Sequence, residues 1–342
     1  MADYIRATPT FEHHLVFAVA PGCQLDDGVH ELVASVRELP SGFGRQIVAV
    51  REATAAVAPD VVHAHSSLAG TCARVALGSR WRHRVVYTPH CYAFERTDVG
   101  AATRSVFWLA EAALSLKGGH VAACSPYEAR LARSLPGRQQ VVYVPNIAGP
   151  DAATRPGAPL DRVEGELVVT AIGRLAPQKG PELFARAALR SRAAGHPSRW
   201  VWVGGGEPDL EDGLRRAGVR VTGWLPRRQA LDHLWASDVY VHTAAWDGAP
   251  ITVLEAAAAE VPVLARRTSA MEALGVEPLF DSAEELADLV GQLPGGNAVD
   301  LARRCGQRLR ETHTPAAQSQ ALHRVYRLAA LSAGAGGRSP ST

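Results

Sequence analysis

The sequence predicts an α/β fold made of two halves, each a parallel β-sheet covered by helices. Short runs rich in β-branched residues alternate with longer stretches rich in Ala, Leu and Arg, as expected when each strand is followed by a crossover helix. This alternation stops in a stretch rich in Pro, Gly, Ala and Asp, residues 148–160, and then restarts. A chain of 342 residues is long enough for two domains with separate cores.

The expected elements follow from this alternation. Strands are expected at 15–18, 61–64, 85–88, 121–123 and 141–144 in the first half, and at 167–172, 200–203, 219–222, 239–242 and 261–265 in the second. We therefore expect a first domain over residues 1–147, a linker over 148–160 and a second domain over 161–331 that ends in closing helices. The Gly/Ser/Pro-rich stretch 332–342 is expected to be a disordered tail.

The beginning of the chain departs from the usual order of a doubly wound domain. Such a domain opens with a central strand and a Gly-containing turn, whereas Met1–Thr8 reads as the end of a helix that leads into the strand near Leu15. We expect the first domain to lack its first strand and Gly-rich turn, and the native polypeptide to begin about 20 residues upstream. The alternative is an unusual domain with another strand in that place.

The composition narrows the classes of function. The formal net charge is +2 with no basic block, so no nucleic acid is expected as a partner. Five scattered cysteines without a CxxC pair suit a reducing cytoplasm. No signal-peptide pattern and no run of about 18 apolar residues is present. We expect a soluble cytoplasmic protein and leave peripheral contact with the inner face of the membrane open, although Phe107, Trp108 and Leu109 are interpreted as packing residues.

Residues 171–180, Ala-Ile-Gly-Arg-Leu-Ala-Pro-Gln-Lys-Gly, follow a strand and open a helix. Gly173 permits close approach to the backbone, and the free N–H groups of a helix start attract anions. Arg174 and Lys179 flank the turn, and two cations there suit a diphosphate. Lys179 is informative because Lys117 is the only other lysine of this arginine-rich chain. The alternative is a solvated loop with two unrelated cations.

A second segment, Trp-Asp-Gly-Ala-Pro-Ile-Thr-Val-Leu-Glu at 246–255, follows the strand expected at 239–242. Asp247 is expected in the loop above the strand, and Glu255 about one turn into the next helix, where both carboxylates can accept hydrogen bonds from sugar or ribose hydroxyls. Nearby backbone N–H groups can meet phosphate oxygens: those of Gly248, Ala249 and Ile251, but not of Pro250, which has none. The alternative is an N-capping Asp and a Glu on the helix surface.

Taken together, the two segments resemble glycosyltransferase family 4, the retaining enzymes of GT-B fold. The family pattern G-R-x4-K-G corresponds to residues 173–180, and E-x7-E corresponds to Asp247 and Glu255, with Asp247 one methylene shorter than the usual glutamate. Smaller matches lie at 203–207, 221–225, 59–65, 87–90, Ser125 and 144–146. The resemblance implies two Rossmann-like domains whose parallel sheets face a central cleft.

The resemblance also implies roles for the matched residues. Arg174 and Lys179 would bind the donor pyrophosphate, and Glu255 would hold the ribose hydroxyls. Asp247, with the backbone of Gly248–Ile251, would hold the transferred sugar. His90 would reach the reaction centre from the first domain. The base pocket would be lined by Gly204, Gly205 and Leu225. Such enzymes generally need no metal ion or other cofactor, because two cations and a helix N-terminus take the role of the metal.

The sequence therefore favours a retaining hexosyltransferase. Its expected donor is a UDP- or GDP-linked sugar, and its acceptor hydroxyl would lie on a glycan, a lipid-linked or a small-molecule acceptor, in the synthesis of cell-envelope or exported glycans. Two alternatives remain open. One is a catalytically silent glycosyltransferase-like subunit that binds a nucleotide or a partner enzyme. The other is a sugar-nucleotide epimerase of the same fold.

Overall fold

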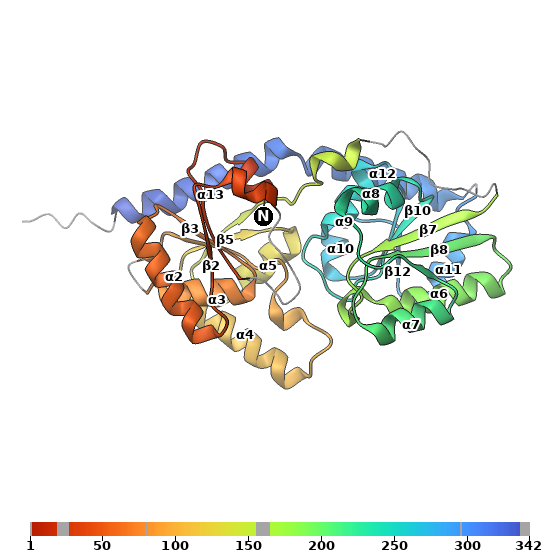
Figure 1. Cartoon of the computed structure of the whole chain (residues 1–342), viewed down its shortest axis with the longest axis horizontal. Coiled ribbons are helices and arrows are strands. Elements are labelled where there is room, and N and C mark those ends of the chain that lie inside the picture. The colour runs from red at the N-terminus through yellow and green to blue at the C-terminus, as the bar shows by residue number, and fades with distance from the viewer. Residues whose placement is uncertain (1, 19–26, 79–80, 155–164, 295, 336–342) are drawn as a thin grey trace, which may run out of the picture. The chain divides into compact units, whose positions relative to one another are not determined.

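The computed structural model of the chain describes residues 2–18, 27–78, 81–154, 165–294 and 296–335. The chain forms two compact units. Unit 1 comprises Met1–Glu95, Gly100–Pro145 and Thr314–Thr342, and unit 2 comprises Arg96–Val99 and Asn146–His313. Each unit contains parallel strands flanked by helices (Figure 1), which confirms the predicted α/β class.

Unit 2 is built on a single six-stranded parallel sheet in the order β12-β11-β10-β7-β8-β9. Its strands are β7 (Leu167–Ile172), β8 (Ser198–Val203), β9 (Arg220–Val221), β10 (Val239–His242), β11 (Val263–Arg266) and β12 (Leu279–Phe280). The chain adds β8 and β9 on one side of β7 and the later strands on the other. The order therefore reverses between β7 and β10, and open α/β sheets bind ligands at the carboxyl ends of the strands at such a point.

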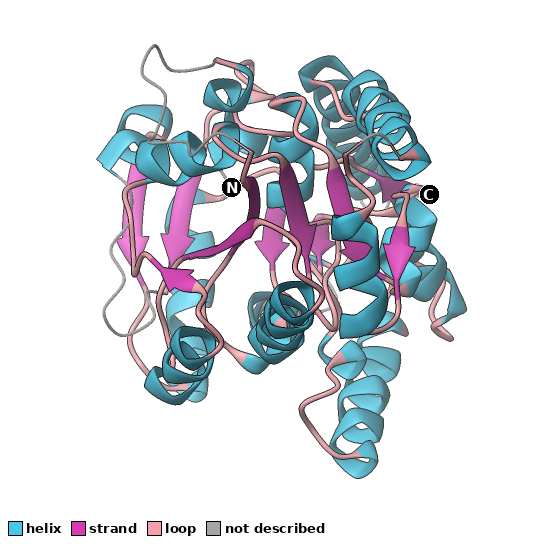
Figure 2. Ribbon diagram, turned by 90° about the vertical axis from the view of Figure 1, so that its right-hand side faces the viewer, coloured by secondary structure: helices cyan, strands magenta, loops and turns pink. Residues whose placement is uncertain are grey.

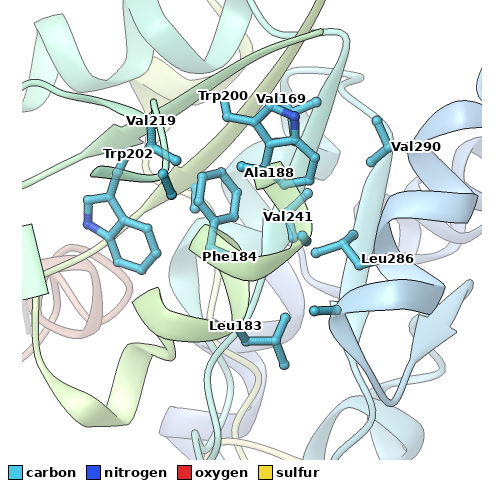
Figure 3. Close-up of a cluster of buried hydrophobic side chains, with 14 of the residues drawn as sticks. Val169, Leu183, Phe184, Ala188, Trp200, Trp202, Val219, Val241, Leu286 and Val290 are labelled. Atoms are coloured by element: carbon cyan, nitrogen blue, oxygen red, sulfur yellow. The ribbon is translucent and has the colours of Figure 1, made fainter. Parts of the chain in front are cut away.

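Helices cover both faces of this sheet (Figure 2). On one face α6, α7 and α11 pack over Val169, Trp200 and Trp202, with Phe184 of α6 between the two indole rings (Figure 3). The alternate residues of the strands face α8. Both faces are apolar because the sheet is buried on both sides. The helices are α6 (Pro181–Ala193), α7 (Pro208–Arg216), α8 (Arg227–Trp235), α9 (Ile251–Ala258), α10 (Ser269–Leu274), α11 (Ala283–Gly291) and α12 (Asn297–Thr312).

Unit 1 contains a four-stranded parallel sheet in the order β3-β4-β5-β6. Its strands are β3 (Val62–His65), β4 (Val85–Thr88), β5 (His120–Ala123) and β6 (Gln140–Tyr143). The helices of the unit are α1 (Ala2–Arg6), α2 (Phe43–Val57), α3 (Ser67–Ala76), α4 (Ala101–Ser115), α5 (Pro126–Ser134) and α13 (Pro315–Ala335). Helices α2 to α5 pack on one face of the sheet, and α13 packs on the other.

A separate two-stranded parallel sheet precedes these strands in unit 1, formed by β1 (His14–Phe17) and β2 (Ser35–Glu38). In the part of the chain that the structure describes, β1 pairs only with β2, and β3 pairs only with β4. Helix α1 leads into β1, as expected from the first residues of the sequence. The start of the native polypeptide stays a prediction. Strand β2, Ser-Val-Arg-Glu, was not predicted because it is short and mostly polar.

The structure corrects the prediction at the C-terminal end of the chain. Helix α13 was expected to close the second domain, but it belongs to unit 1, where its buried Leu322, Val325 and Ala329 pack against β4, β5 and β6. The helix also continues to Ala335, four residues into the expected disordered tail. The remainder of that tail, 336–342, and the second part of the expected linker, 155–160, lie outside the described residues.

None of the described helices is both long enough and apolar enough to cross a lipid bilayer.

Candidate functional site

The two segments singled out in the second half meet at the point where the strand order reverses. Residues 173–180 follow β7 and residues 243–250 follow β10, its neighbour in the sheet. Hydrogen bonds to backbone carbonyls join the two loops. The Ala245 N–H donates to the Gln178 carbonyl (2.8 Å), the Gln178 amide donates to the Trp246 carbonyl (3.1 Å), and the Thr243 hydroxyl donates to the Lys179 carbonyl (2.6 Å).

Two glycines allow other backbone segments to approach the loop after β7 closely. Gly180 has a φ of +66°, and a Cβ atom there would lie 2.3 Å from the Thr243 carbonyl oxygen. Gly204, expected in the base pocket, has a φ of +133°, and its Cβ would lie 2.2 Å from the Gly173 carbonyl oxygen. Both positions require glycine for conformation and for space. The stem of Lys179 lies beside Gly173, so this predicted glycine also leaves room for the lysine.

Lys179 and Asp247 form an ion pair with 2.6 Å between Nζ and Oδ2. The other carboxylate oxygen, Oδ1, accepts the Gly248 backbone N–H at 2.9 Å. Burial by itself would raise the pKa of Asp247, but the nearby charges, chiefly Lys179, together with the hydrogen bonds from Lys179 and the Gly248 N–H outweigh burial, and the pKa lies below its ordinary value. The structure thus brings together two residues that the sequence placed 68 positions apart. It also shows that the Gly248 N–H, expected to meet phosphate, is already engaged by Asp247.

His242, at the end of β10, is a neighbour of Asp247 that the sequence did not predict. Its Nε2 is 3.9 Å from Asp247 Oδ2, and its Nδ1 is 3.2 Å from the hydroxyl of Tyr240. Because that hydroxyl donates to Thr252, it can accept from Nδ1–H, which defines the tautomer. Burial lowers the pKa of His242 to about 4, with a contribution from Lys179 against the opposing effect of Asp247. The ring is therefore neutral near pH 7.

Arg174 lies on the same loop as Lys179, with its side chain exposed. Among the described residues its guanidinium takes part in no ion pair or side-chain hydrogen bond, so it is available to an anionic ligand. The two predicted cations thus differ in their partners: Lys179 forms an ion pair with Asp247, whereas Arg174 forms none with any described residue.

The remaining predicted donor-site residues lie around these loops. Glu255 is in the second turn of α9, buried, and paired with Arg227. Gly248, Ala249 and Pro250 are buried before α9, and the Ala249 carbonyl accepts the Asn146 side-chain amide at 2.9 Å. Ile251 is exposed at the first position of the helix.

The loop after β9 was expected to contribute to a base pocket through Leu225. Leu225 is only partly buried, packed against Val168, Val201 and Val203. Its neighbour Trp224 is 69% exposed and lies so close to Gly205 that a Cβ there would come within 3.0 Å of the indole ring. An exposed aromatic ring beside a glycine backbone offers a surface on which a planar base can stack.

His90 lies in unit 1, just beyond the end of β4, with a φ of +53°. Its Nε2 is 2.9 Å from Nδ1 of His65, and the two rings are stacked. His63 donates from Nε2 to Thr88, whose own hydroxyl donates to a backbone carbonyl, so His63 Nδ1 accepts from Tyr326. Burial, helped by His90, lowers the pKa of His63 to about 3. These contacts keep His63 neutral and in one tautomer.

His63 and His65 share a face of β3, as expected from their spacing, with ring centroids 4.1 Å apart. Across the described ranges, no three His, Cys, Asp or Glu side chains are grouped as metal ligands. The two histidines contact each other, Tyr326 and His90. The sequence could show that they share a face, but not that His65 contacts His90.

Family models match both halves of the chain. Residues 2–147 match a glycosyl transferase 4-like domain, and residues 166–294 match the glycosyl transferases group 1. A curated relative from Escherichia coli, UDP-Gal:alpha-D-GlcNAc-diphosphoundecaprenol alpha-1,3-galactosyltransferase, is 29% identical over 222 residues. This match covers 60% of the chain and 57% of that protein. The chain therefore spans little more than half the length of this relative.

Solved structures share the fold over nearly the whole chain. The crystal structure of Anabaena Alr3699/HepE in complex with UDP and glucose has a TM-score of 0.71 at 15% identity, covering 98% of this chain and 95% of that one. Sucrose-phosphate synthase (tll1590) from Thermosynechococcus elongatus has a TM-score of 0.68 at 16% identity, covering 97% of this chain and 90% of that one. At such identities the likeness establishes the fold, which is GT-B.

Proposed function

The chain belongs to the glycosyltransferases of GT-B fold, and we propose that it transfers a hexose from a UDP-sugar to an acceptor hydroxyl with retention at the anomeric carbon. The observation that carries the proposal is the meeting of the two loops after β7 and β10. They present Lys179, Asp247 and the open guanidinium of Arg174 where the strand order reverses. The UDP in the name of the Escherichia coli relative, and in the solved complex of the same fold, supports uridine as the base.

Lys179 would bind the diphosphate while it keeps its contact with Asp247. An ammonium group has three N–H donors, and only one is needed for the contact with Asp247 Oδ2. Arg174 would close on the same diphosphate from the exposed side of the loop. The negative charge that develops on the departing nucleotide would then be stabilised by both cations, which lowers the barrier to transfer.

Asp247 would hold the transferred sugar. Its two oxygens have about four lone-pair sites, and Lys179 and the Gly248 N–H use two of them, which leaves capacity for sugar hydroxyls. Because the pKa of Asp247 lies below its ordinary value, the carboxylate stays ionised and remains a strong acceptor. We propose that it orients the sugar. The departing phosphate would take the proton of the acceptor hydroxyl on the face that it leaves.

We propose that the acceptor is a lipid-linked glycan, by analogy with the diphosphoundecaprenol acceptor in the name of the relative, and that the chain works in peripheral contact with the inner face of a membrane. Helix α4 supports this. Phe107 packs inward, but Trp108 and Leu109 are exposed, together with Val106 and Leu116. The interpretation of Trp108 and Leu109 as packing residues was therefore wrong. An exposed apolar helix face of this kind suits the interface of a lipid bilayer.

The experiment that tests the proposed function combines binding and turnover. Thermal unfolding would be followed with UDP, GDP and ADP, because a nucleotide at 100 times its dissociation constant adds about 2.7 kcal/mol of stability. UDP-hexoses would then be incubated with lipid-linked acceptors, and the anomeric configuration of the product read by NMR. Stabilisation by UDP together with a retained product is expected. Binding without turnover of any donor would instead support the silent subunit, and an altered sugar nucleotide would support the epimerase.

A further inference from the structure

We infer that Arg227 is a positioning residue of the donor site, which holds Glu255 ionised and in place for the ribose hydroxyls of the bound nucleotide. The inference rests on the proposed function, because it names how the ribose of the donor is recognised. Arg227 lies outside both of the segments that carry the family resemblance.

The ion pair joins two helices of unit 2. Arg227 is the first residue of α8, and Glu255 is in the second turn of α9. Nη1 of Arg227 lies 2.7 Å from Oε1 of Glu255. The two sides of the pair are unlike: the arginine side chain is 50% exposed, whereas the glutamate side chain is only 6% exposed. A half-exposed guanidinium thus provides the positive charge next to a buried carboxylate.

The guanidinium of Arg227 also rests against the backbone of Gly149. A Cβ atom at Gly149 would lie 2.3 Å from Nη2 of Arg227, so a larger residue would push the arginine away. Contact with a carboxylate on one side and with a glycine on the other restricts the arginine to a narrow range of positions. This distinguishes it from a flexible surface cation that meets an acid by chance.

The chemistry of Glu255 explains why it needs this partner. An ionised carboxylate in a buried position is unfavourable without a counter-charge, and a protonated one is a weaker acceptor. Pairing at Oε1 is compatible with a ribose hydrogen bond, because a carboxylate has about four lone-pair sites. A hydroxyl also donates more strongly to a charged oxygen than to a neutral one. Arg227 would therefore set the strength of ribose recognition without touching the ribose.

The neighbouring residue offers a matched control. Arg228 is on the same helix, its side chain is 52% exposed, and it also pairs with an acid, Asp232, at 3.6 Å. Asp232 is 28% exposed, however, and the Arg228 guanidinium lies over the ring of Trp235. Loss of Arg228 removes the same charge from the same helix and leaves Glu255 paired.

The test is the binding of UDP, 2′-deoxy-UDP and 3′-deoxy-UDP to the whole chain, measured by titration calorimetry. For the unaltered chain and for Arg228→Ala, the deoxy nucleotide that lacks the Glu255 contact should bind about 10-fold more weakly than UDP, the value expected for one hydrogen bond to a charged group. For Arg227→Ala and for Glu255→Gln, that ratio should fall to about 3 or less. Arg227→Lys, which keeps the charge, should restore part of it.

A double variant separates positioning from direct contact. If Arg227 acts through Glu255, then Arg227→Ala in a Glu255→Gln chain should cause little further loss of UDP affinity. An equal loss in both backgrounds would show that Arg227 touches the nucleotide itself and would overturn the inference. If Arg227→Ala keeps the difference of about 10-fold in affinity between UDP and the deoxy nucleotide, the inference is also overturned, whereas the proposed function is unaffected. Absence of binding of UDP, GDP and ADP to the unaltered chain would overturn both.

Discussion

Two ion pairs, one in each unit, differ in almost every physical respect. In unit 1, Arg74 and Glu111 are both 5% exposed and lie 2.9 Å apart, with the Tyr87 hydroxyl donating to the second carboxylate oxygen and the Tyr87 ring 4.2 Å from the guanidinium. In unit 2, Lys179 and Asp247 are 26% and 16% exposed and lie on two loops at the ends of strands. The first pair joins α3 to α4 within the core, whereas the second faces the place where strand order reverses.

The difference shows how an ion pair can serve the fold or serve a ligand. In a fully buried ion pair, removal of either partner leaves the other charge unpaired in the core, which strongly destabilises the fold. A partly exposed pair contributes less to stability than an enclosed one. In the proposed function, its role is to hold charged groups in place for the substrate.

Lys179→Ala should have the largest effect, on turnover. In the proposed function Lys179 stabilises the departing diphosphate, so its loss is expected to lower kcat by roughly 10²–10³. The free energy of unfolding should fall by roughly 1–3 kcal/mol, because Asp247 is mostly buried and loses its counter-charge. Donor turnover and urea unfolding of the same preparation measure the two quantities.

The control for Lys179→Ala is Lys117→Ala, which removes the other lysine of the chain and leaves the donor loops untouched. Lys117 donates to the Arg74 carbonyl in unit 1, and its loss should leave kcat within about 2-fold. Normal turnover in Lys179→Ala would contradict the proposal that the Lys179–Asp247 pair serves a ligand and not the fold.

Glu111→Gln should show the reverse pattern. Leaving the Arg74 guanidinium buried without its carboxylate is expected to cost about 3–5 kcal/mol of unfolding free energy. UDP affinity should be unchanged at temperatures where the variant is folded, since both residues of the pair lie in unit 1. Urea unfolding and calorimetric titration test the two statements. A stable Glu111→Gln variant with weakened UDP binding would contradict the assignment of this pair to the fold.

The dependence of stability on pH should appear in both units. The pKa of His63 is lowered from 6.5 to about 3 and that of His242 to about 4, both chiefly by burial. The folded chain keeps these rings neutral while the unfolded chain takes up protons below pH 6.5. The stability is therefore fully present above pH 6.5 and is lost as pH falls toward 4 and then 3.

Each unit of pKa difference between the folded and unfolded chain corresponds to about 1.4 kcal/mol, so roughly 3–5 kcal/mol should be lost for each histidine over this range. His63→Asn should flatten the curve of urea midpoint against pH without removing the contribution of His242. Parallel curves for the variant and the unaltered chain would mean that His63 is protonated in the fold.

The smallest expected effect is that of a chelator. If Lys179 and Arg174 supply the charge that a metal ion supplies elsewhere, excess EDTA should leave UDP binding and transfer unchanged. Lost activity that Mg²⁺ or Mn²⁺ restores would mean that these two cations are insufficient.

Local sequence patterns predicted the fold class and the two loops to which the proposed donor site is assigned. Alternating strand and helix patterns require a parallel sheet, and unit 2 follows them closely because its strands are apolar on both faces. The pattern that contains Gly173, Lys179 and Gly180 identified the first loop, because the glycines are demanded by local conformation and spacing. Strand β2 escaped detection, since four mostly polar residues carry no such periodic signal.

Which residues meet across long stretches of the chain could be seen only in the folded protein. Helix α13 follows unit 2 in the chain, yet it covers the sheet of unit 1, because the apolar side chains that it can bury against are there. The sequence also did not show which side chains contact the predicted site residues. Arg227 beside Glu255, His242 behind Asp247 and His65 against His90 are contacts between segments that are separated along the chain. Local sequence patterns reflect the preferences of the backbone, whereas contacts between charged side chains depend on how whole strands and helices are placed in space.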